Sequence, residues 1–95
     1  MKNNNVISSH SDITTLKDGT KLRVVIENYE NPLFSHGTPM RVQCKVEYVK
    51  TRGTRWVGNY YENHLTTQEL IDEVAHIIAG IETDENKYKS EFAQA

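Results

Sequence analysis

The sequence predicts an α+β fold: a two-layer sandwich in which an antiparallel meander of three or four strands packs against one amphipathic C-terminal helix. Two patterns carry this prediction. Residues 40–49 alternate apolar with polar or charged side chains, as in a strand with one buried face. Residues 70–81 repeat apolar side chains at the spacing of a helix with one apolar stripe. The short links between predicted strands favour antiparallel neighbours, so we expect the order ββββα.

Length and composition bound the class of protein. A chain of 95 residues is enough for one domain with a small core. Its one cysteine, Cys44, excludes a disulfide within the chain and is typical of a reducing compartment. The first residues lack the apolar segment of a secretory signal, and no apolar run approaches the ~18 residues of a bilayer crossing. We therefore expect a soluble, cytoplasmic protein that does not contact membranes.

The N-terminal third predicts a tail and a hairpin. Residues 1–11 are polar and rich in Asn and Ser, which predicts a flexible tail before a single domain at residues 12–82. Asp18-Gly19 is typical of a two-residue hairpin turn that requires positive φ, and it predicts strands at residues 13–16 and 21–29.

A loop is predicted for residues 30–39, because Pro32, Gly37 and Pro39 interrupt regular structure there. Leu33 and Phe34 lie inside this predicted loop. Apolar side chains on a loop are either tucked under the sheet or available to a partner, so these two are candidate contacts.

The stretch from Met40 to Tyr61 predicts the third and fourth strands, the latter over residues 55–61. It also carries a candidate binding surface of basic and aromatic side chains: Lys45, Lys50, Arg52, Arg55, Trp56 and Tyr61. Positive charge beside aromatic rings suits phosphate contact and base stacking. The same pattern is typical of a solvated strand face with cross-strand ion pairs, because Glu27 and Glu47 fall on that face. A pI near 6.0 also weighs against nucleic acid as the partner.

The predicted helix has a well-marked start. Thr66 is a favourable N-cap, Glu69 completes a capping box, and Leu65 and Leu70 have the spacing of a hydrophobic staple. Gly80 is the expected C-cap. Residues 83–95 would then form a short second helix or a frayed tail.

Charge is distributed unevenly along the chain. Residues 1–61 hold nine Lys/Arg and five Asp/Glu (+4), whereas residues 62–95 hold two Lys and eight Asp/Glu (−6), which sum to −2. Glu69, Asp72 and Glu73 form an acidic ridge on the predicted helix, which is either an ordinary solvated face or a docking surface for a basic protein.

No set of residues predicts catalysis. The four histidines show no i, i+4 pairing with one another or with the cysteine, so no metal site is expected. Cys44 falls on the core side of its strand, where a nucleophile would lack an exposed, electropositive setting. We therefore expect neither an enzyme nor a cofactor.

A capped acidic helix, "TTQELIDEV", following a β-meander resembles the element order of small phage-encoded inhibitors such as some anti-CRISPR proteins. The resemblance covers residues 13–81, includes no diagnostic motif and transfers no functional residue. It implies a non-enzymatic interaction protein that masks a surface of its protein partner. The alternative is a nucleic-acid-binding module that uses the basic hairpin. Edge strands of the sheet also allow a homodimer.

If the hairpin binds nucleic acid, Arg52→Ala and Arg55→Ala should each weaken binding to a labelled duplex. Each should also lower the salt slope of log K by about one unit, since each removes one phosphate contact. A salt titration of DNA binding measures both effects. Unchanged slopes would argue against this role for the hairpin.

Overall fold

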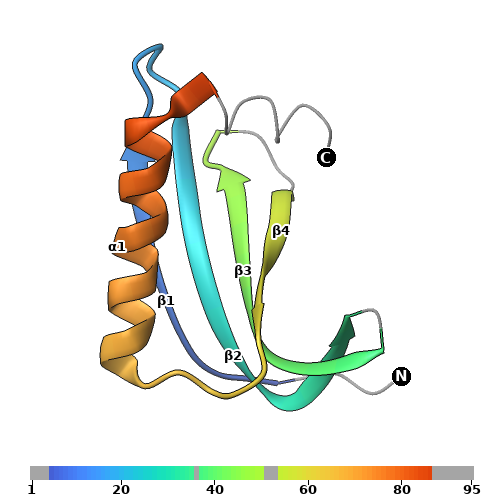
Figure 1. The fold of residues 1–95 in the computed structure, drawn as a ribbon. Helices are drawn as coiled ribbons and strands as arrows, with labels where there is room; N and C mark the ends of the chain where they lie inside the picture. Colours follow the sequence, from blue (N-terminus) through green and yellow to red (C-terminus); the bar gives the residue numbers. More distant parts are fainter. Residues whose placement is uncertain (1–4, 36, 51–53, 87–95) are drawn as a thin grey trace.

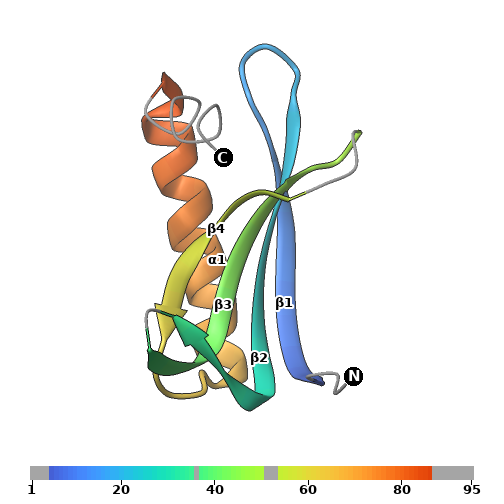
Figure 2. The same cartoon turned by 90° about the vertical axis from the view of Figure 1, so that its right-hand side faces the viewer.

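The computed structural model describes residues 5–35, 37–50 and 54–86, with the backbone alone for residues 35 and 54–60. Its elements are β1 (Val6–Thr15), β2 (Lys21–Ser35), β3 (Thr38–Tyr48), β4 (Thr54–Tyr61) and α1 (Thr67–Thr83). The strands form one sheet in the order β1-β2-β3-β4, with every neighbouring pair antiparallel. Helix α1 lies against one face of this sheet (Figures 1 and 2). The predicted α+β class, with an antiparallel sheet and one helix, is confirmed.

The core lies between α1 and the inner face of the sheet. The buried side chains of β2 and β3 alternate as the sequence predicts, and all are 0% exposed: Leu22, Val24, Ile26, Val42, Cys44 and Val46. The helix contributes Leu70, Val74, Ile77 and Ile81. Helix α1 lies mainly over β1 and β2. Its apolar stripe packs on the sheet and closes this small core.

Strand β1 begins at Val6, so the prediction of a loose tail over residues 1–11 is wrong from residue 6 onward. The stretch "VISSHSDITT" has little apolar alternation because β1 is an edge strand, and Thr14 is its one buried residue. Backbone pairing with β2, which needs no apolar side chain, holds it in the sheet.

The β1–β2 turn also differs from the two-residue turn expected at Asp18-Gly19. The Gly19 amide donates to the Leu16 carbonyl at 3.0 Å, and the Leu16 amide donates to the Thr20 carbonyl at 2.8 Å. Gly19 has φ +90°. This is a three-residue loop whose last position is left-handed, which explains the glycine there.

Strand β2 continues to Ser35, so the loop predicted for residues 30–39 is largely strand. Leu33 pairs with Met40 and Phe34 pairs with Pro39, after an irregular stretch that follows Asn28. Pro32 lies in this stretch, where no residue pairs in the β2–β3 ladder. The amide hydrogen that proline lacks is therefore not needed there. The chain then turns at Gly37, whose φ is +82°.

A bulge in the β3–β4 pairing changes the face of Tyr61. Cys44 pairs with Gly58 but Val42 pairs with Tyr61, so β4 holds one residue more than β3 over this interval. The Tyr61 side chain consequently packs on the core and donates to Glu73 of α1. Strict alternation along β4 predicts instead that Tyr61 faces solvent, so its place in the predicted binding surface is wrong.

Helix α1 starts as predicted. The Thr66 hydroxyl accepts from the Glu69 amide at 3.1 Å, and the Glu69 carboxylate accepts from the Thr66 amide at 2.9 Å. The helix continues past Gly80 to Thr83 with Asp84 as C-cap, so the expected stop at Gly80 is wrong. The second helix expected over 83–95 falls mostly outside the described residues. Among those described, no helix combines the length and apolar composition that a bilayer crossing requires.

Asn28 holds the linker before α1 against the sheet. This residue is 3% exposed. Its side-chain nitrogen donates to the Ser8 hydroxyl at 2.7 Å and to the Leu65 carbonyl at 2.8 Å, while its oxygen accepts from the Leu65 amide at 3.1 Å. One buried amide thus joins β1, β2 and the entry to the helix.

Asn28→Ala should lower the free energy of unfolding by about 2–3 kcal/mol, because it removes three hydrogen bonds and leaves the Leu65 backbone groups without their partner. The control Ser8→Ala removes one of these bonds and should cost less than about 1 kcal/mol. Urea unfolding measures both. Equal losses in the two variants would contradict a bridging role for Asn28.

Candidate protein-interaction surface

The most exposed large apolar side chain among the described residues is Phe34, at 73%. It lies on the arm, the β2–β3 extension of residues 30–40, in which His36 falls outside the described residues. Leu33 and Met40 are half-buried in the same extension, and Pro39 is exposed opposite Phe34. Figure 1 shows the arm curling past the end of β4, on the side of the molecule away from α1.

The outer sheet face braces the base of the arm through Tyr29. This side chain is only 7% exposed. Its hydroxyl donates to Glu27 Oε1 at 2.9 Å and lies 3.2 Å from Gln43 Oε1. Burial, together with the Glu27 carboxylate, raises the pKa of Tyr29, so the hydroxyl stays a donor at neutral pH.

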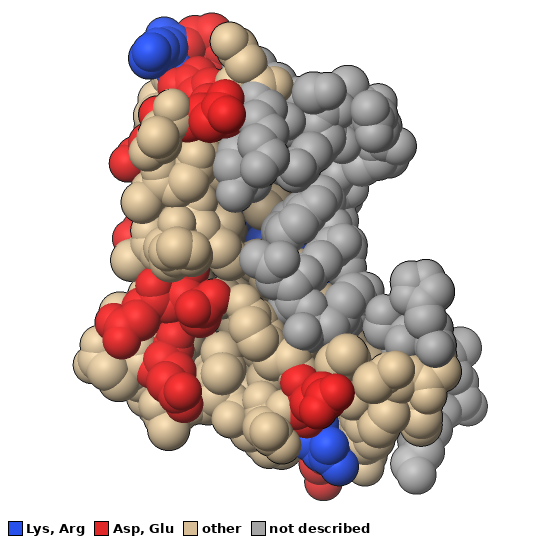
Figure 3. Space-filling view, in the orientation of Figure 1, with Lys and Arg blue, Asp and Glu red and all other residues tan. Residues whose placement is uncertain are grey.

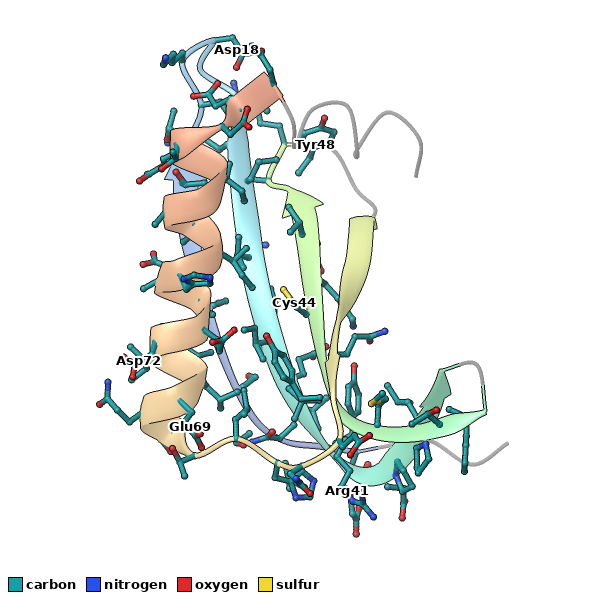
Figure 4. All side chains as sticks on the ribbon, in the orientation of Figure 1. Asp18, Arg41, Cys44, Tyr48, Glu69 and Asp72 are labelled. Carbon is teal, nitrogen blue, oxygen red and sulfur yellow. The ribbon has the colours of Figure 1, made fainter. Side chains whose placement is uncertain are left out.

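The linker between β4 and α1 braces the arm from below. Arg41, labelled in Figure 4, donates from Nη1 to the Glu62 carbonyl at 3.3 Å. The His64 Nε2 lies 2.6 Å from the Tyr29 carbonyl, so this ring nitrogen is the donor. The arm therefore extends from a fixed base, and its tip leaves apolar surface in solvent.

The residues of the predicted hairpin surface do not share one face of the sheet. Lys45 forms an ion pair with Glu27, with 2.8 Å between Nζ and Oε1, on the outer side of the sheet. Glu27 holds the pKa of Lys45 above its usual value. Tyr61 faces the helix instead. Lys50 is exposed.

The remaining members of that predicted surface are not placed. Arg52 and the side chains of Arg55 and Trp56 lie outside the described residues.

The three residues of the predicted acidic ridge make three different kinds of contact. Glu69 serves the helix cap, and Asp72 accepts from the Gln68 side chain at 2.9 Å. Glu73 turns inward and accepts from the Tyr61 hydroxyl at 2.6 Å. Figure 3 shows acidic side chains over α1, whose sequence contains no Lys or Arg. Glu69 and Asp72 are exposed and Glu73 is half-buried, so the ridge is not one uniformly solvated acidic face.

The buried centre beside Glu73 does not favour nucleophilic chemistry. Cys44 is 0% exposed and lies on the helix side of β3 (Figure 4). Burial and the nearby Glu73 carboxylate raise the pKa of its thiol to about 12. Burial and the same carboxylate also raise the pKa of Tyr61 well above its usual value. In the described part of the chain, no group of three or more His, Cys, Asp or Glu could hold a metal ion.

Sequence reasoning found Leu33 and Phe34 but missed Tyr29, Pro39 and Met40 as parts of the same feature. One signal in "NPLFSHGTPM" does indicate a hairpin: a glycine suited to a turn, with a proline near each end of the segment. Comparison of the chain with protein-family models, curated proteins and solved structures found no match.

Native Cys44 should react with iodoacetamide at pH 8 at least roughly 1,000-fold more slowly than in the urea-unfolded chain, because the thiol is both buried and protonated. A pKa near 12 instead of 9.0 lowers the thiolate fraction by about that factor. Mass spectrometry of alkylated protein over time measures the rates. Similar native and unfolded rates would show that the thiol is accessible and that the core geometry around Cys44 is wrong.

Proposed function

We propose that this chain is a non-enzymatic interaction protein whose arm binds a partner protein through Phe34. The observation that carries the proposal is a phenylalanine 73% exposed on a hairpin extension with a braced base. Phe34 forms one apolar surface with its pairing partner Pro39, and contiguous exposed apolar surface is typical of interaction sites. An inhibitor or adaptor that masks a partner surface would work in this way.

The energetics of such an arm are favourable. Burying an exposed Phe side chain contributes about 1.5–3 kcal/mol, enough to make it the central anchor of an interface. Tyr29, Arg41 and His64 already fix the arm's base, so binding immobilises little additional chain. Leu33 and Pro39 extend the apolar contact on either side of the anchor.

The chemistry of the arm favours an apolar cavity on the partner rather than a charged one. Within the described tip, residues 31–35 and 37–40 contain no Lys, Arg, Asp or Glu. A nucleic acid would find no phosphate-binding charge there.

Nucleic-acid binding through the sheet has less support. Of the cations expected on the hairpin, Lys45 is neutralised by Glu27. Arg23 lies opposite Glu47 in the strand register, and Arg41 donates to the backbone carbonyl of Glu62. Acidic residues interleaved with the cations of this face weigh against a nucleic-acid partner.

Phe34→Ser should reduce capture of the partner by about tenfold or more, because it removes the anchor's apolar surface. The experiment compares immobilised wild type, Phe34→Ser and Phe34→Leu by quantitative mass spectrometry of proteins retained from a cell extract. Phe34→Leu should retain most of the binding. His76→Ser, at an exposed position of α1, is the matched control.

A protein retained by wild type, Phe34→Leu and His76→Ser but lost by Phe34→Ser supports the proposal. Retention that is unaffected by Phe34→Ser would contradict it. A salt titration against labelled duplex and single-stranded DNA accompanies the capture. Salt-sensitive DNA binding that persists in Phe34→Ser would favour the nucleic-acid alternative.

A further inference from the structure

Strand β1 and helix α1 carry the exposed large apolar side chains outside the arm. Among the described residues, these are Val6, Ile7 and Ile13 of β1 and Ile71 of α1, which are 43%, 55%, 45% and 38% exposed. In the described chain β1 pairs with β2 alone, so its other side is a free edge of the sheet (Figure 2). Long edge strands with apolar side chains and no Lys or Pro readily accept another strand.

The backbone hydrogen bonds show which groups this edge presents. The Leu16 amide donates across the hairpin to Thr20, which makes the even-numbered residues of this part of β1 the ones bonded to β2. The Ile13 amide does not donate to β2 but to the side chain of its neighbour, Asp12 Oδ1, at 2.8 Å. Ser9, Ser11 and Ile13 therefore direct their backbone N–H and C=O groups away from the sheet.

The helix flank above this edge is also apolar. Successive helical residues are rotated by about 100°, which places Ile71, Ala75 and Ile78 together on one flank. Glu82 continues that flank, and its carboxylate accepts from the Thr14 hydroxyl at 2.8 Å, so the flank faces β1. Glu73, on the other flank, is bonded to Tyr61. The side of α1 next to the free edge thus combines small and apolar residues.

The geometry points to a second copy of this chain as the occupant: two β1 strands pair antiparallel about a two-fold axis at Ser11 and join their sheets. Ser11 has an outward-directed backbone, as a residue that pairs with its own copy through hydrogen bonds must have. In this register Ser9 lies opposite Ile13 of the second copy. The dimer does not use the arm: its axis is at Ser11, six positions after Asn5, which is bonded to Glu30 at the base of the arm.

Side-chain complementarity favours this register. His10 lies opposite Asp12 of the second copy, and Asp12 lies opposite its His10, so the two-fold axis produces two imidazole–carboxylate pairs. Directly opposed residues that are not hydrogen-bonded through the backbone bring their side chains closest. Pairing of the Ile13 amide with the second strand also releases the Asp12 carboxylate from that amide.

The helices meet at the same axis. Glu82 is joined to Thr14, and Leu65 before the helix is joined through Asn28 to the position of Ser8. Ser11 is midway between Ser8 and Thr14, so it is level with the middle of α1. The small side chain of Ala75 lies there and lets two helices approach closely, with Ile71 and Ile78 on either side.

Analytical ultracentrifugation tests the dimer. Wild type should sediment as a concentration-dependent dimer, and Ser11→Pro should raise the dissociation constant about tenfold or more because it removes an outward amide that β2 does not use. Ser11→Ala keeps the amide and should dimerise as wild type does. A wild type that stays monomeric up to its solubility limit overturns the proposal, as does a dimer that Ser11→Pro leaves intact.

A helix variant keeps the test independent of the fold of β1. Ile71→Lys places a charge on the flank that faces the second copy and should weaken the dimer about tenfold or more. His76→Lys adds the same side chain at an exposed position about 140° around the helix and should have no effect. Equal dimerisation of the two variants overturns the placement of the helices at the axis.

Cysteine crosslinking tests the register in which the two β1 strands pair. Residues paired with their own copy have Cα atoms about 5.5 Å apart, within disulfide range, so Ser11→Cys should give a crosslinked dimer under mild oxidation. Ser9→Cys, also exposed, lies opposite residue 13 and should crosslink far less. Cys44 is buried and does not compete. Preferential crosslinking at residue 9, or none at 11, overturns the register.

Discussion

One helix has to cover the apolar face of a whole sheet, and this constraint organises the rest of the molecule. The four buried side chains of α1 are at most 3% exposed, and each contributes about 1.5–3 kcal/mol by leaving water. The apolar residues that they cover belong mainly to β2 and β3, while the helix itself runs over β1 and β2. The linker after β4 must therefore cross below the sheet to reach the helix start. Its contacts with Asn28, Tyr29 and Arg41 are a consequence of that crossing.

The same constraint explains why the arm carries exposed apolar surface. Strands β2 and β3 extend beyond the level at which the linker and helix cover the sheet. Past Tyr29 none of the described elements forms a second layer over the strands, and Phe34 is exposed there although its residue type favours burial. The irregular pairing around Pro32 bends this extension away from the sheet without loss of the strand pairing at its tip.

Polar contacts divide the molecule's charges between structure and surface. Glu27, Glu69 and Glu73 each accept a hydrogen bond or ion pair that holds two elements or a helix terminus together. A carboxylate engaged in this way is less available to a partner, because breaking its bond offsets the gain from a new one. Within the part of the chain that the structure describes, the arm presents the exposed Phe34 side chain, and the β1 edge presents outward backbone groups at Ser9 and Ser11. A protein with both would be able to present two arms from one assembly.

The sequence by itself determined the α+β class, the capped start of α1 at Thr66 and the inward face of β3. Each depends on neighbours within a few residues: a capping box spans three positions, and strand alternation repeats every two. It did not determine the beginning of β1 at Val6, the passage of β2 through Pro32 or the inward turn of Tyr61. Those features depend on partners far along the chain, because β1 is held by backbone pairing and a bulge is defined only against the opposite strand. Leu33 and Phe34 were recognisable as apolar residues in an unusual setting. Only the tertiary structure decided that Phe34 is exposed, because burial depends on whether a second layer reaches that end of the sheet.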